Sequence, residues 1–282
     1  MTDSDVPGAV ALWEEAFGEM SERYGEVRAP RSVEAERRLE NRLRHFLDTD
    51  PGGSWIAEDA GEIVGLSQSL VREGYWVLSL LATAPKSQRR GLGRELLDRA
   101  MTNAEPSAPG TIQSSQDPSA MALYESVGFS LHPGLIGRGT VRPGRVRPDP
   151  SVRDGDGRDL DLVDAVDRRV RGSARSIDIA AMLDEPGNRL LLTSDRGYAV
   201  VGDDRVVTLG ARDEDAAIAL LTTALAGAGQ GTTFEVMWLT SSQQWAIHTL
   251  VAAGVALHPY GAVMVRGFAL PPTPYLPSGG YG

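Results

Sequence analysis

The chain has 282 residues, 41% of them apolar, and a formal net charge of −10. This length suits one large or two ordinary domains, and the apolar share is enough to build cores. Because the sequence contains no cysteine, disulfides, thiolate nucleophiles and cysteine metal sites are excluded. The four histidines lack the spacing of a metal-binding motif, so we expect no metal site. The opening residues do not resemble a signal peptide and no apolar run of membrane-spanning length follows, so we expect a cytoplasmic protein.

The first hundred residues alternate between helical and strand patterns. Apolar residues recur at helical spacing over 5–24 and again over 33–47, which predicts two helices. Apolar runs over 54–58 and 62–71, joined at Ala60-Gly61, predict a hairpin. A further run over 78–82 predicts a strand that ends before Pro85, because proline lacks the backbone N–H that a strand interior needs. Another helix is expected from Leu92.

Between this strand and this helix lies the segment Gln88-Arg89-Arg90-Gly91-Leu92-Gly93. Its two glycines let a bulky ligand approach the main chain, and the first N–H groups of a helix have no internal partner. Such a helix start binds anions. Without an anion, a basic first turn would oppose the helix dipole. A basic island on an acidic protein indicates a phosphate-bearing ligand rather than nucleic acid. The basic residues of this island are Lys86, Arg89, Arg90 and Arg94.

The next segment predicts a loop over 106–110, a strand over 111–115 and a short helix. Asp117 is a good N-cap, Pro118 suits the first helical position, and Gly128 ends the helix.

Two motifs in this region resemble those of the GNAT superfamily of N-acyltransferases. The pattern Q-x-x-G-x-G after a strand resembles the acetyl-CoA pyrophosphate loop of that family. Residues 117–129 resemble its second signature, N-x-x-A-x-x-L-Y-x-x-x-G-F, with Asp117 in place of asparagine. Their order and separation identify residues 1 to about 140 as a GNAT-like domain. Such domains usually open with a strand, whereas this chain begins almost at the first helix.

The second half resembles a diverged copy of the first. A shift of 126 residues aligns residues 128–133 with 254–259 without gaps. We therefore expect an α/β fold of two tandem GNAT-like domains, each a mixed, mostly antiparallel twisted sheet flanked by helices. The expected divisions are a catalytic domain over 1–142, a linker over 143–157, a degenerate domain over 158–267 and a Pro/Gly-rich tail over 268–282.

The differences between the copies indicate which one is active. The same shift sets residues 86–93 against 212–219, where Asp215, Ala216, Ala217 and Ala219 replace the arginines and glycines of the loop. Acidic residues at a helix start compensate its dipole and repel a pyrophosphate. We expect the second copy not to bind acetyl-CoA, its helices over 216–226 and 245–253 to pack the core, and its role to be lining the acceptor cleft or mediating dimerisation.

The resemblance implies direct attack of an amine on the thioester of acetyl-CoA, a co-substrate. A tyrosine of the second signature, Tyr124, would protonate the leaving thiolate; the alternative is a core tyrosine whose hydroxyl is bonded to a neighbour. In the second copy Leu250 takes its place. The implied acetyl-CoA-binding residues are Leu81, Ala82 and Thr83 along the pantetheine arm, Gln88, Arg89, Arg90, Gly91, Leu92, Gly93 and Arg94 at the pyrophosphate, and Asp117.

The general base is left open. Many family members carry a carboxylate on the strand before the loop, where this chain has Ser79. Fifteen tail residues could extend about 45 Å at roughly 3.1 Å each, so the tail could enter the active site; a disordered terminus is the alternative. The remaining candidates are Glu58, Asp59, Glu73, His132 and the terminal carboxylate of Gly282.

Together these patterns predict an N-acetyltransferase that acts on a primary amine. Two alternatives are an acetyl-CoA-binding sensor without turnover and a scaffold protein. The acidic surface favours a cationic acceptor such as a polyamine, an aminoglycoside or a basic peptide. We expect no nucleic-acid or membrane partner, and a homodimer is one expected assembly.

Overall fold

The computed structural model describes residues 1–25, 32–142, 144–229 and 231–282. The chain divides into two compact units, residues 1–110 with Tyr281 and residues 111–280 with Gly282. This division precedes position 142, where we expected the first domain to end, and the predicted domain boundaries stay predictions. No helix in the described ranges is long and apolar enough to cross a membrane.

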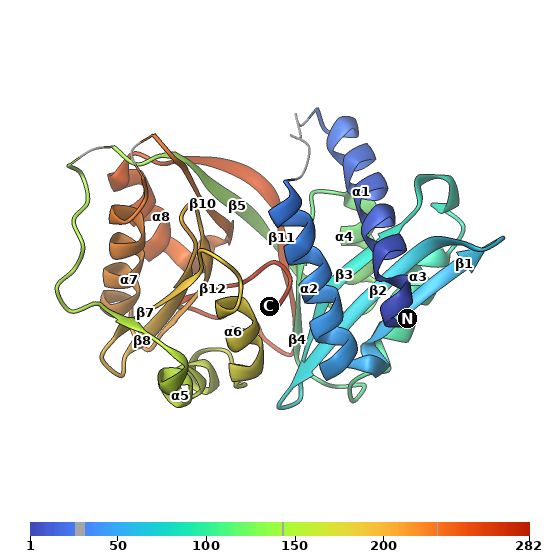
Figure 1. Cartoon of the computed structure of the whole chain (residues 1–282), viewed down its shortest axis with the longest axis horizontal. Helices are drawn as coiled ribbons and strands as arrows, with labels where there is room; N and C mark the ends of the chain where they lie inside the picture. Colours follow the sequence, from blue (N-terminus) through green and yellow to red (C-terminus); the bar gives the residue numbers. More distant parts are fainter. Residues whose placement is uncertain (26–31, 143, 230) are drawn as a thin grey trace. The chain divides into compact units, whose positions relative to one another are not determined.

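The first unit is an antiparallel sheet covered by helices on both faces (Figure 1). Its elements confirm the predicted order of helices and strands. The third strand begins earlier than expected, because Tyr75, Trp76 and Val77 pair with the preceding strand and are buried. The bounds are α1 (Val6–Arg23), α2 (Val33–Thr49), β1 (Ser54–Asp59), β2 (Glu62–Arg72), β3 (Tyr75–Thr83) and α3 (Leu92–Met101).

Alternate residues of β2 point to opposite faces of this sheet. Leu66 packs in the apolar core with residues of α1 and α2. Its neighbour Ser67 instead donates a hydrogen bond to the carbonyl of Leu96 in α3, at 3.0 Å. Helices α1 and α2 therefore cover one face, and α3 covers the other (Figure 1).

The second unit contains two groups of strands with their own helices. Its first group comprises β4 (Gly110–Ser114, whose first residue belongs to the first unit), α4 (Pro118–Glu125), β5 (Ser130–Thr140), β10 (Thr233–Leu239), α8 (Gln244–Ala253) and β11 (Ala256–Arg266). Its second group comprises β6 (Arg153–Gly155), α5 (Leu160–Val170), α6 (Ser176–Leu183), β7 (Arg189–Thr193), β8 (Gly197–Val201), β9 (Val206–Ala211), α7 (Glu214–Ala226) and β12 (Tyr275–Leu276).

The first group of strands interleaves the two sequence copies. The order is β4-β11-β5-β10, so β5 of the first copy lies between β10 and β11 of the second. The 126-residue shift maps β5 onto the bounds of β11. The β5–β11 pairing is nearly symmetric: Ser130 pairs with Val265, and Ala256, which corresponds to Ser130, pairs with Arg138. The repeat detected in the sequence is therefore visible as paired, equivalent strands.

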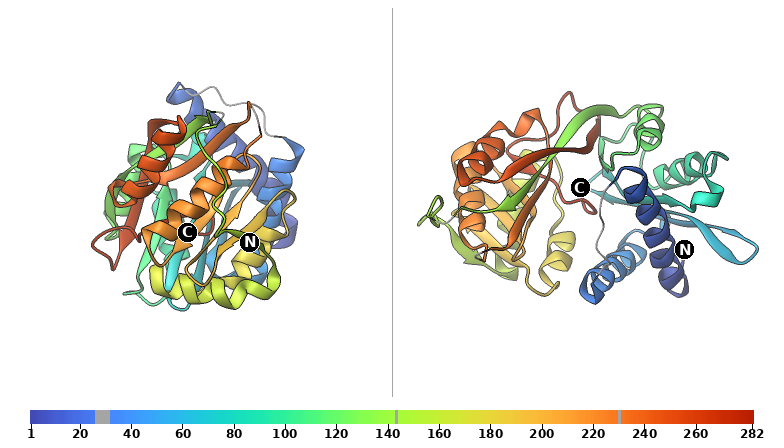
Figure 2. Two further views of the ribbon diagram at one scale, coloured as in Figure 1. Left: turned by 90° about the vertical axis from the view of Figure 1, so that its left-hand side faces the viewer. Right: turned by 90° about the horizontal axis from the view of Figure 1, so that it is seen from above.

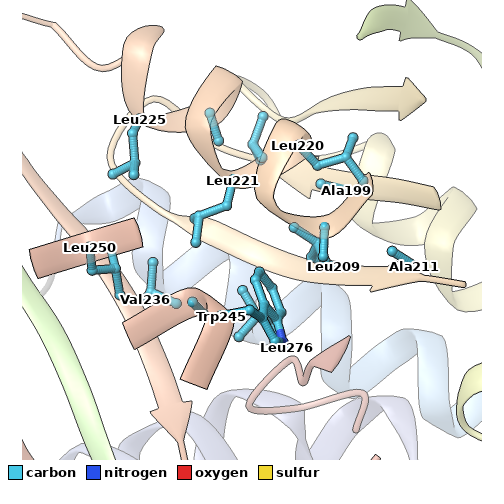
Figure 3. Packing of buried hydrophobic residues seen from close by; sticks show 14 of the residues in the cluster. Ala199, Leu209, Ala211, Leu220, Leu221, Leu225, Val236, Trp245, Leu250 and Leu276 are labelled. Carbon is cyan, nitrogen blue, oxygen red and sulfur yellow. The ribbon is translucent and has the colours of Figure 1, made fainter. Parts of the chain in front are cut away.

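The second group is an antiparallel sheet in the order β12-β9-β8-β7-β6. Helix α7 lies along β7, β8 and β9 and contacts α8, an arrangement that can be followed in Figures 1 and 2. Figure 3 shows the core that results, in which Leu220 and Leu221 of α7, Trp245 and Leu250 of α8 and Leu276 of the tail are buried. The expected packing role of these two helices is consistent with this core.

The expected linker and tail are more structured than their composition suggests. Within the linker, whose first residue lies outside the described ranges, residues 153–155 form edge strand β6. The tail is not a disordered terminus, so that alternative is wrong. Its strand β12 pairs with β9 at the sheet edge, the position in a sheet where proline-rich segments are tolerated.

A buried polar network joins this unit around Arg175. The guanidinium contacts the carboxylate of Asp167 at 2.9 Å, and both side chains are fully buried. It also donates to the hydroxyls of Tyr198 and Thr208, at 3.0 and 2.8 Å, and to the carbonyl oxygen of Gly282. Elements from α5, β8, β9 and the tail are thereby connected through one side chain.

Candidate active site

The expected phosphate loop is a main-chain cradle at the start of α3. Gly91 is the N-cap residue with φ of 87°, and Arg89 also has a positive φ, 59°. The carbonyl of Gly91 accepts from the N–H groups of Arg94 and Glu95, whereas the N–H groups of residues 89–93 donate no main-chain hydrogen bond in the described chain. Successive free N–H groups at a helix start form an anion-binding concavity.

Helix α3 is fixed to the sheet by hydrogen bonds from small polar side chains. Ser69 donates to the carbonyl of Ala100 at 2.8 Å, and the indole N–H of Trp76 donates to the same oxygen at 3.2 Å. Leu96 and Leu97 are buried on the sheet side. The loop therefore sits on a rigid helix start, which favours a preorganised site.

Not all of the basic residues around the loop remain available to bind an anion. Lys86 forms an ion pair with Glu62, and this hydrogen-bonded contact lowers the pKa of Glu62 and raises the pKa of Lys86. Arg94 forms an ion pair with Asp98, one helical turn away. Arg89 and Arg90 are exposed and have no ion pair within the described residues. These two arginines therefore remain to bind an anion at the loop.

The strand before the loop contains a β-bulge. Leu80 pairs with Gln68 and Leu78 pairs with Ser69, so Ser79 between them faces no residue of β2. Its hydroxyl is buried and has no hydrogen-bond partner. A bulge removes main-chain groups from the ladder and commonly lies next to active sites. Beyond it the expected thioester-lining residues pair with β2 up to the strand end: Leu81 with Ser67, Ala82 with Leu66 and Thr83 with Gly65.

Gln88 lies between this strand end and the loop. Its amide nitrogen is 3.5 Å from the carbonyl oxygen of Thr83, and its amide oxygen is 3.5 Å from the guanidinium of Arg23. Both distances are at the upper limit for hydrogen bonds, so the side chain is only loosely held.

In the second unit, the second signature forms α4. Asp117 caps the helix by accepting from the N–H of Ser119 at 2.9 Å, and Pro118 is its first residue. Tyr124 is 6% exposed, and burial raises the pKa of its hydroxyl, with a smaller contribution from the charge of Asp117. No hydrogen bond to that hydroxyl occurs within the described chain. The hydroxyl is thus protonated and uncommitted, as a proton donor needs to be.

The carboxylates that the sequence offers as general bases in the first unit lie far from the bulge. Glu73 is in the β2–β3 turn, six residues before Ser79, about 20 Å away at roughly 3.3 Å per residue. Glu58 pairs with Ile63 near the other end of β2, with Asp59 beyond it. His132 and Gly282 belong to the second unit. The Nε2 atom of His132 is buried without a partner among the described residues, whereas an oxygen of the terminal carboxylate of Gly282 accepts from Arg175 and from Tyr275, the latter at 2.7 Å.

Sequence reasoning did not single out Arg42 of α2. Its Nε atom is buried and has no hydrogen-bond partner. Tyr281, which belongs to the same unit, lies against this helix: its ring centroid is 5.1 Å from that of Phe46 and 6.0 Å from that of His45. The pattern of α2 gave no signal, because an arginine beside an apolar helix face is common.

The second copy has no equivalent loop. Shifted by 126 residues, 88–91 correspond to 214–217, which form the first turn of α7. Asp213 caps this helix and forms an ion pair with Arg196. Ala217 and Leu250 are fully buried, the latter at the position of Tyr124. That this copy binds no pyrophosphate stays a prediction.

Comparisons with a family model and with solved structures both point to the fold of GNAT acetyltransferases. Residues 20–135 match the model of the acetyltransferase (GNAT) domain. A Pyrococcus horikoshii protein described as a candidate acetyltransferase has a TM-score of 0.78 at 16% identity, with 100% of this chain and 94% of that chain covered. A GCN5-related N-acetyltransferase from Sphaerobacter thermophilus has a TM-score of 0.56 at 16% identity, covering 94% and 93%. A tandem GNAT protein from the clavulanic acid biosynthesis pathway has a TM-score of 0.54 at 15% identity, covering 94% and 95%.

A comparison with curated proteins found no match. At the identities of the solved structures, the likeness concerns the fold, which confirms the expected α/β architecture of tandem GNAT-like domains. Residues 20–135 therefore match the GNAT acetyltransferase domain, and over at least 94% of its length the chain has the fold of solved acetyltransferase and GNAT proteins.

Proposed function

We propose that the protein is an acetyl-CoA-dependent N-acetyltransferase that transfers the acetyl group to a primary amine within a ternary complex. The GNAT domain supports acyl transfer from an acyl-CoA in general. The observation that carries the proposal is the start of α3. The main-chain N–H groups of residues 89–93 donate no main-chain hydrogen bond there, and the side chains of Arg89 and Arg90 have no ion pair within the described residues. A pyrophosphate satisfies all of these groups at once.

In the proposed reaction the amine nitrogen attacks the thioester carbonyl carbon, and the carbon–sulfur bond breaks. The bulge at Ser79 releases main-chain groups of β3 from the ladder, and an N–H there would stabilise the negative charge that develops on the carbonyl oxygen. Tyr124 would donate its proton to the leaving thiolate. The proton lost by the amine passes to solvent or to a base such as His132, and Tyr124 regains its proton from solvent, so charge and atoms balance over one turnover.

The second copy would take no part in the chemistry. Asp213 occupies the start of α7, and its charge would repel a pyrophosphate. We expect one molecule of acetyl-CoA to bind per chain. Isothermal titration calorimetry measures this stoichiometry directly, and two equivalent sites per chain would contradict the assignment.

A thiol-release assay with acetyl-CoA and a panel of primary amines tests the function. We expect amine-dependent release of CoA together with acetylated product detected by mass spectrometry. Binding of acetyl-CoA without release for any amine would support the alternative of a sensor. That alternative is favoured by one observation: β3 carries Ser79 where many family members have a carboxylate.

A further inference from the structure

Helix α2 contains a partly buried cation without a counterion. The Nε atom of Arg42 is inaccessible to solvent, and the guanidinium has no hydrogen bond or ion pair within the described chain. Arg44 on the same helix shows the usual arrangement, with carboxylate contacts to Glu40 at 2.9 Å and to Asp3 at 3.0 Å. Arg42 differs from Arg44 in that its Nε atom is buried without a partner among the described residues.

An unpaired guanidinium in this position is unfavourable. Removing a charged group from water costs free energy unless another charge or hydrogen bonds compensate it. Burial accordingly lowers the pKa of Arg42, although an arginine remains charged at neutral pH. An anion that reached the guanidinium would recover the lost interactions.

The surroundings of Arg42 restrict which anion fits. Arg42, His45 and Phe46 lie on one side of α2, three and four positions apart, and the ring of Tyr281 packs there. Because Nε is inaccessible to solvent, the terminal Nη–H groups of the guanidinium are the donors that an incoming anion would meet, and two of them match the two oxygens of a carboxylate. The aromatic rings provide apolar contacts for the rest of a small organic acid.

This part of α2 lies above the strand pair that carries the bulge. The amide of Gln68 donates to the carbonyl of Leu43 at 2.9 Å, and Gln68 pairs with Leu80 beside Ser79. A molecule held by Arg42 would therefore lie near the point on β3 where the thioester is expected.

We propose that Arg42 binds the carboxylate of the acceptor, that the rings of His45 and Tyr281 contact the rest of it, and that the acceptor is an amino acid or a similar small amino-carboxylate. This inference rests on the proposed acetyl transfer and names its substrate class. It differs from the cationic acceptor that the net charge favours, because the local guanidinium acts at contact distance whereas the surface charge acts through solvent.

The test compares each amino acid with its carboxamide as acceptor in the thiol-release assay. We expect the parent protein to prefer the carboxylate form, and Arg42→Met to lose about ten- to hundred-fold of this preference, mainly through the acceptor KM, because hydrogen bonds to charged groups contribute that much. The ratio between variants cancels the difference in amine reactivity between the two acceptors. Arg42→Lys should retain part of the preference. Arg37→Met, an exposed position on the same helix, is the matched control and should leave the preference unchanged.

The outcomes separate this inference from the proposed function. Absence of thiol release with every amine contradicts acetyl transfer itself. Release at equal efficiency from acids and amides, in the parent and in Arg42→Met alike, overturns the carboxylate site alone. Weaker CoA binding by Arg42→Met would also overturn it, because the arginine would then serve the co-substrate.

A stability measurement excludes a merely structural role. Replacing an uncompensated buried charge by an apolar side chain is commonly neutral or stabilising, so Arg42→Met should unfold at the same or a higher temperature than the parent without ligand. A clear fall in the melting temperature would show that Arg42 stabilises the fold, and would count against the proposal.

Discussion

Gly91 combines two properties at one residue, a positive φ and open space where a side chain would be. A Cβ there would meet no atom within 4 Å, and the φ is 87°. Gly61, in the β1–β2 turn, has the same combination with φ of 83°. Valine at either position is strained by about 1–3 kcal/mol. The two glycines therefore form a matched pair in which only one lies at the proposed phosphate loop.

We expect Gly91→Val to abolish acetyl-CoA binding, because its isopropyl group would occupy the space that the pyrophosphate needs. Gly61→Val should lose similar stability but retain binding. Calorimetric titration of both variants, with thermal unfolding as the measure of strain, checks the prediction. Equal affinities in the two variants would place the pyrophosphate elsewhere. Ala217→Val, at the corresponding position of the second copy, is unsuitable as a control because Ala217 is fully buried.

Tyr124 is the residue for which a chemical role can be separated from a packing role. Tyr124→Phe keeps the ring in its buried place and removes only the hydroxyl. We expect acetyl-CoA affinity and folding to be retained and kcat to fall about 10²-fold, the lower end for general acid catalysis, because a thiolate is a tolerable leaving group. Steady-state thiol release measures this, and an unchanged kcat would make the tyrosine structural.

The pKa of Tyr124 gives this prediction a pH dependence. Burial raises the pKa above the ordinary value of 10, so the hydroxyl stays protonated throughout the range in which the enzyme can be assayed. The parent should therefore lose no activity through ionisation of Tyr124 below pH 10. An alkaline limb of kcat below that pH that disappears in Tyr124→Phe would contradict the burial seen here.

For single residues, the sequence could predict those roles that depend on neighbours a few positions away in the chain. Asp117 caps α4 and Gly91 caps α3 as the sequence indicates, because caps depend on residues a few positions apart. The bulge at Ser79 depends on the register between β2 and β3. The pairing of Lys86 depends on where Glu62 falls in the hairpin. Such properties follow only from the assembled sheet.

At the scale of elements, helix α3 of the first copy and its counterpart α7 of the second differ in sequence. They also begin at positions that are not equivalent in the repeat. Helix α3 begins at Leu92, whereas α7 begins at Glu214, four residues earlier than the repeat would place it. The acidic N-cap and alanines of the second copy signalled a better helix start. The sequence therefore predicted the loss of the loop correctly in kind, but the extra helical turn required the structure.

The elements around Arg175 depend on one buried ion pair. We expect Arg175→Met to destabilise the protein by about 3–5 kcal/mol, because the buried carboxylate of Asp167 would lose its counterion and keep only the hydrogen bond from the hydroxyl of Tyr198. The double variant with Asp167→Leu should recover much of this loss. Urea unfolding of the single and double variants measures both. A single variant as stable as the parent would show that the network contributes little to folding.

At the scale of the whole molecule, the two copies are not separable segments. Strand β5 of the first copy has both of its neighbours, β10 and β11, in the second. We expect a chain that ends after residue 142 to leave residues 130–140 unpaired and to unfold without cooperativity in that region. Amide hydrogen exchange and NMR dispersion of the fragment test this, and coexpression of residues 143–282 should restore protection. A fragment with protected amides at 130–140 would contradict the prediction.

The repeat was visible in the sequence because equivalent strands kept their spacing. What the sequence did not predict is that these strands pair with each other across the repeat, since a local pattern does not specify strand partners. The alignment of residues 128–133 with 254–259 indicated a repeat and not an interleaved sheet.

This interleaving has a consequence for the protein as it leaves the ribosome. Position Ala256, where β11 begins, is synthesised 116 residues after Thr140, where β5 ends. At about 5–20 residues per second, the nascent β5 waits roughly 6–23 s for β11, the later of its two neighbours to be synthesised. A strand with unpaired edges is prone to aggregate during such a delay, and proline, glycine and charge reduce this tendency. Strand β5 carries Pro133, three glycines and Arg138, a composition suited to a segment that must remain monomeric until the second copy has emerged.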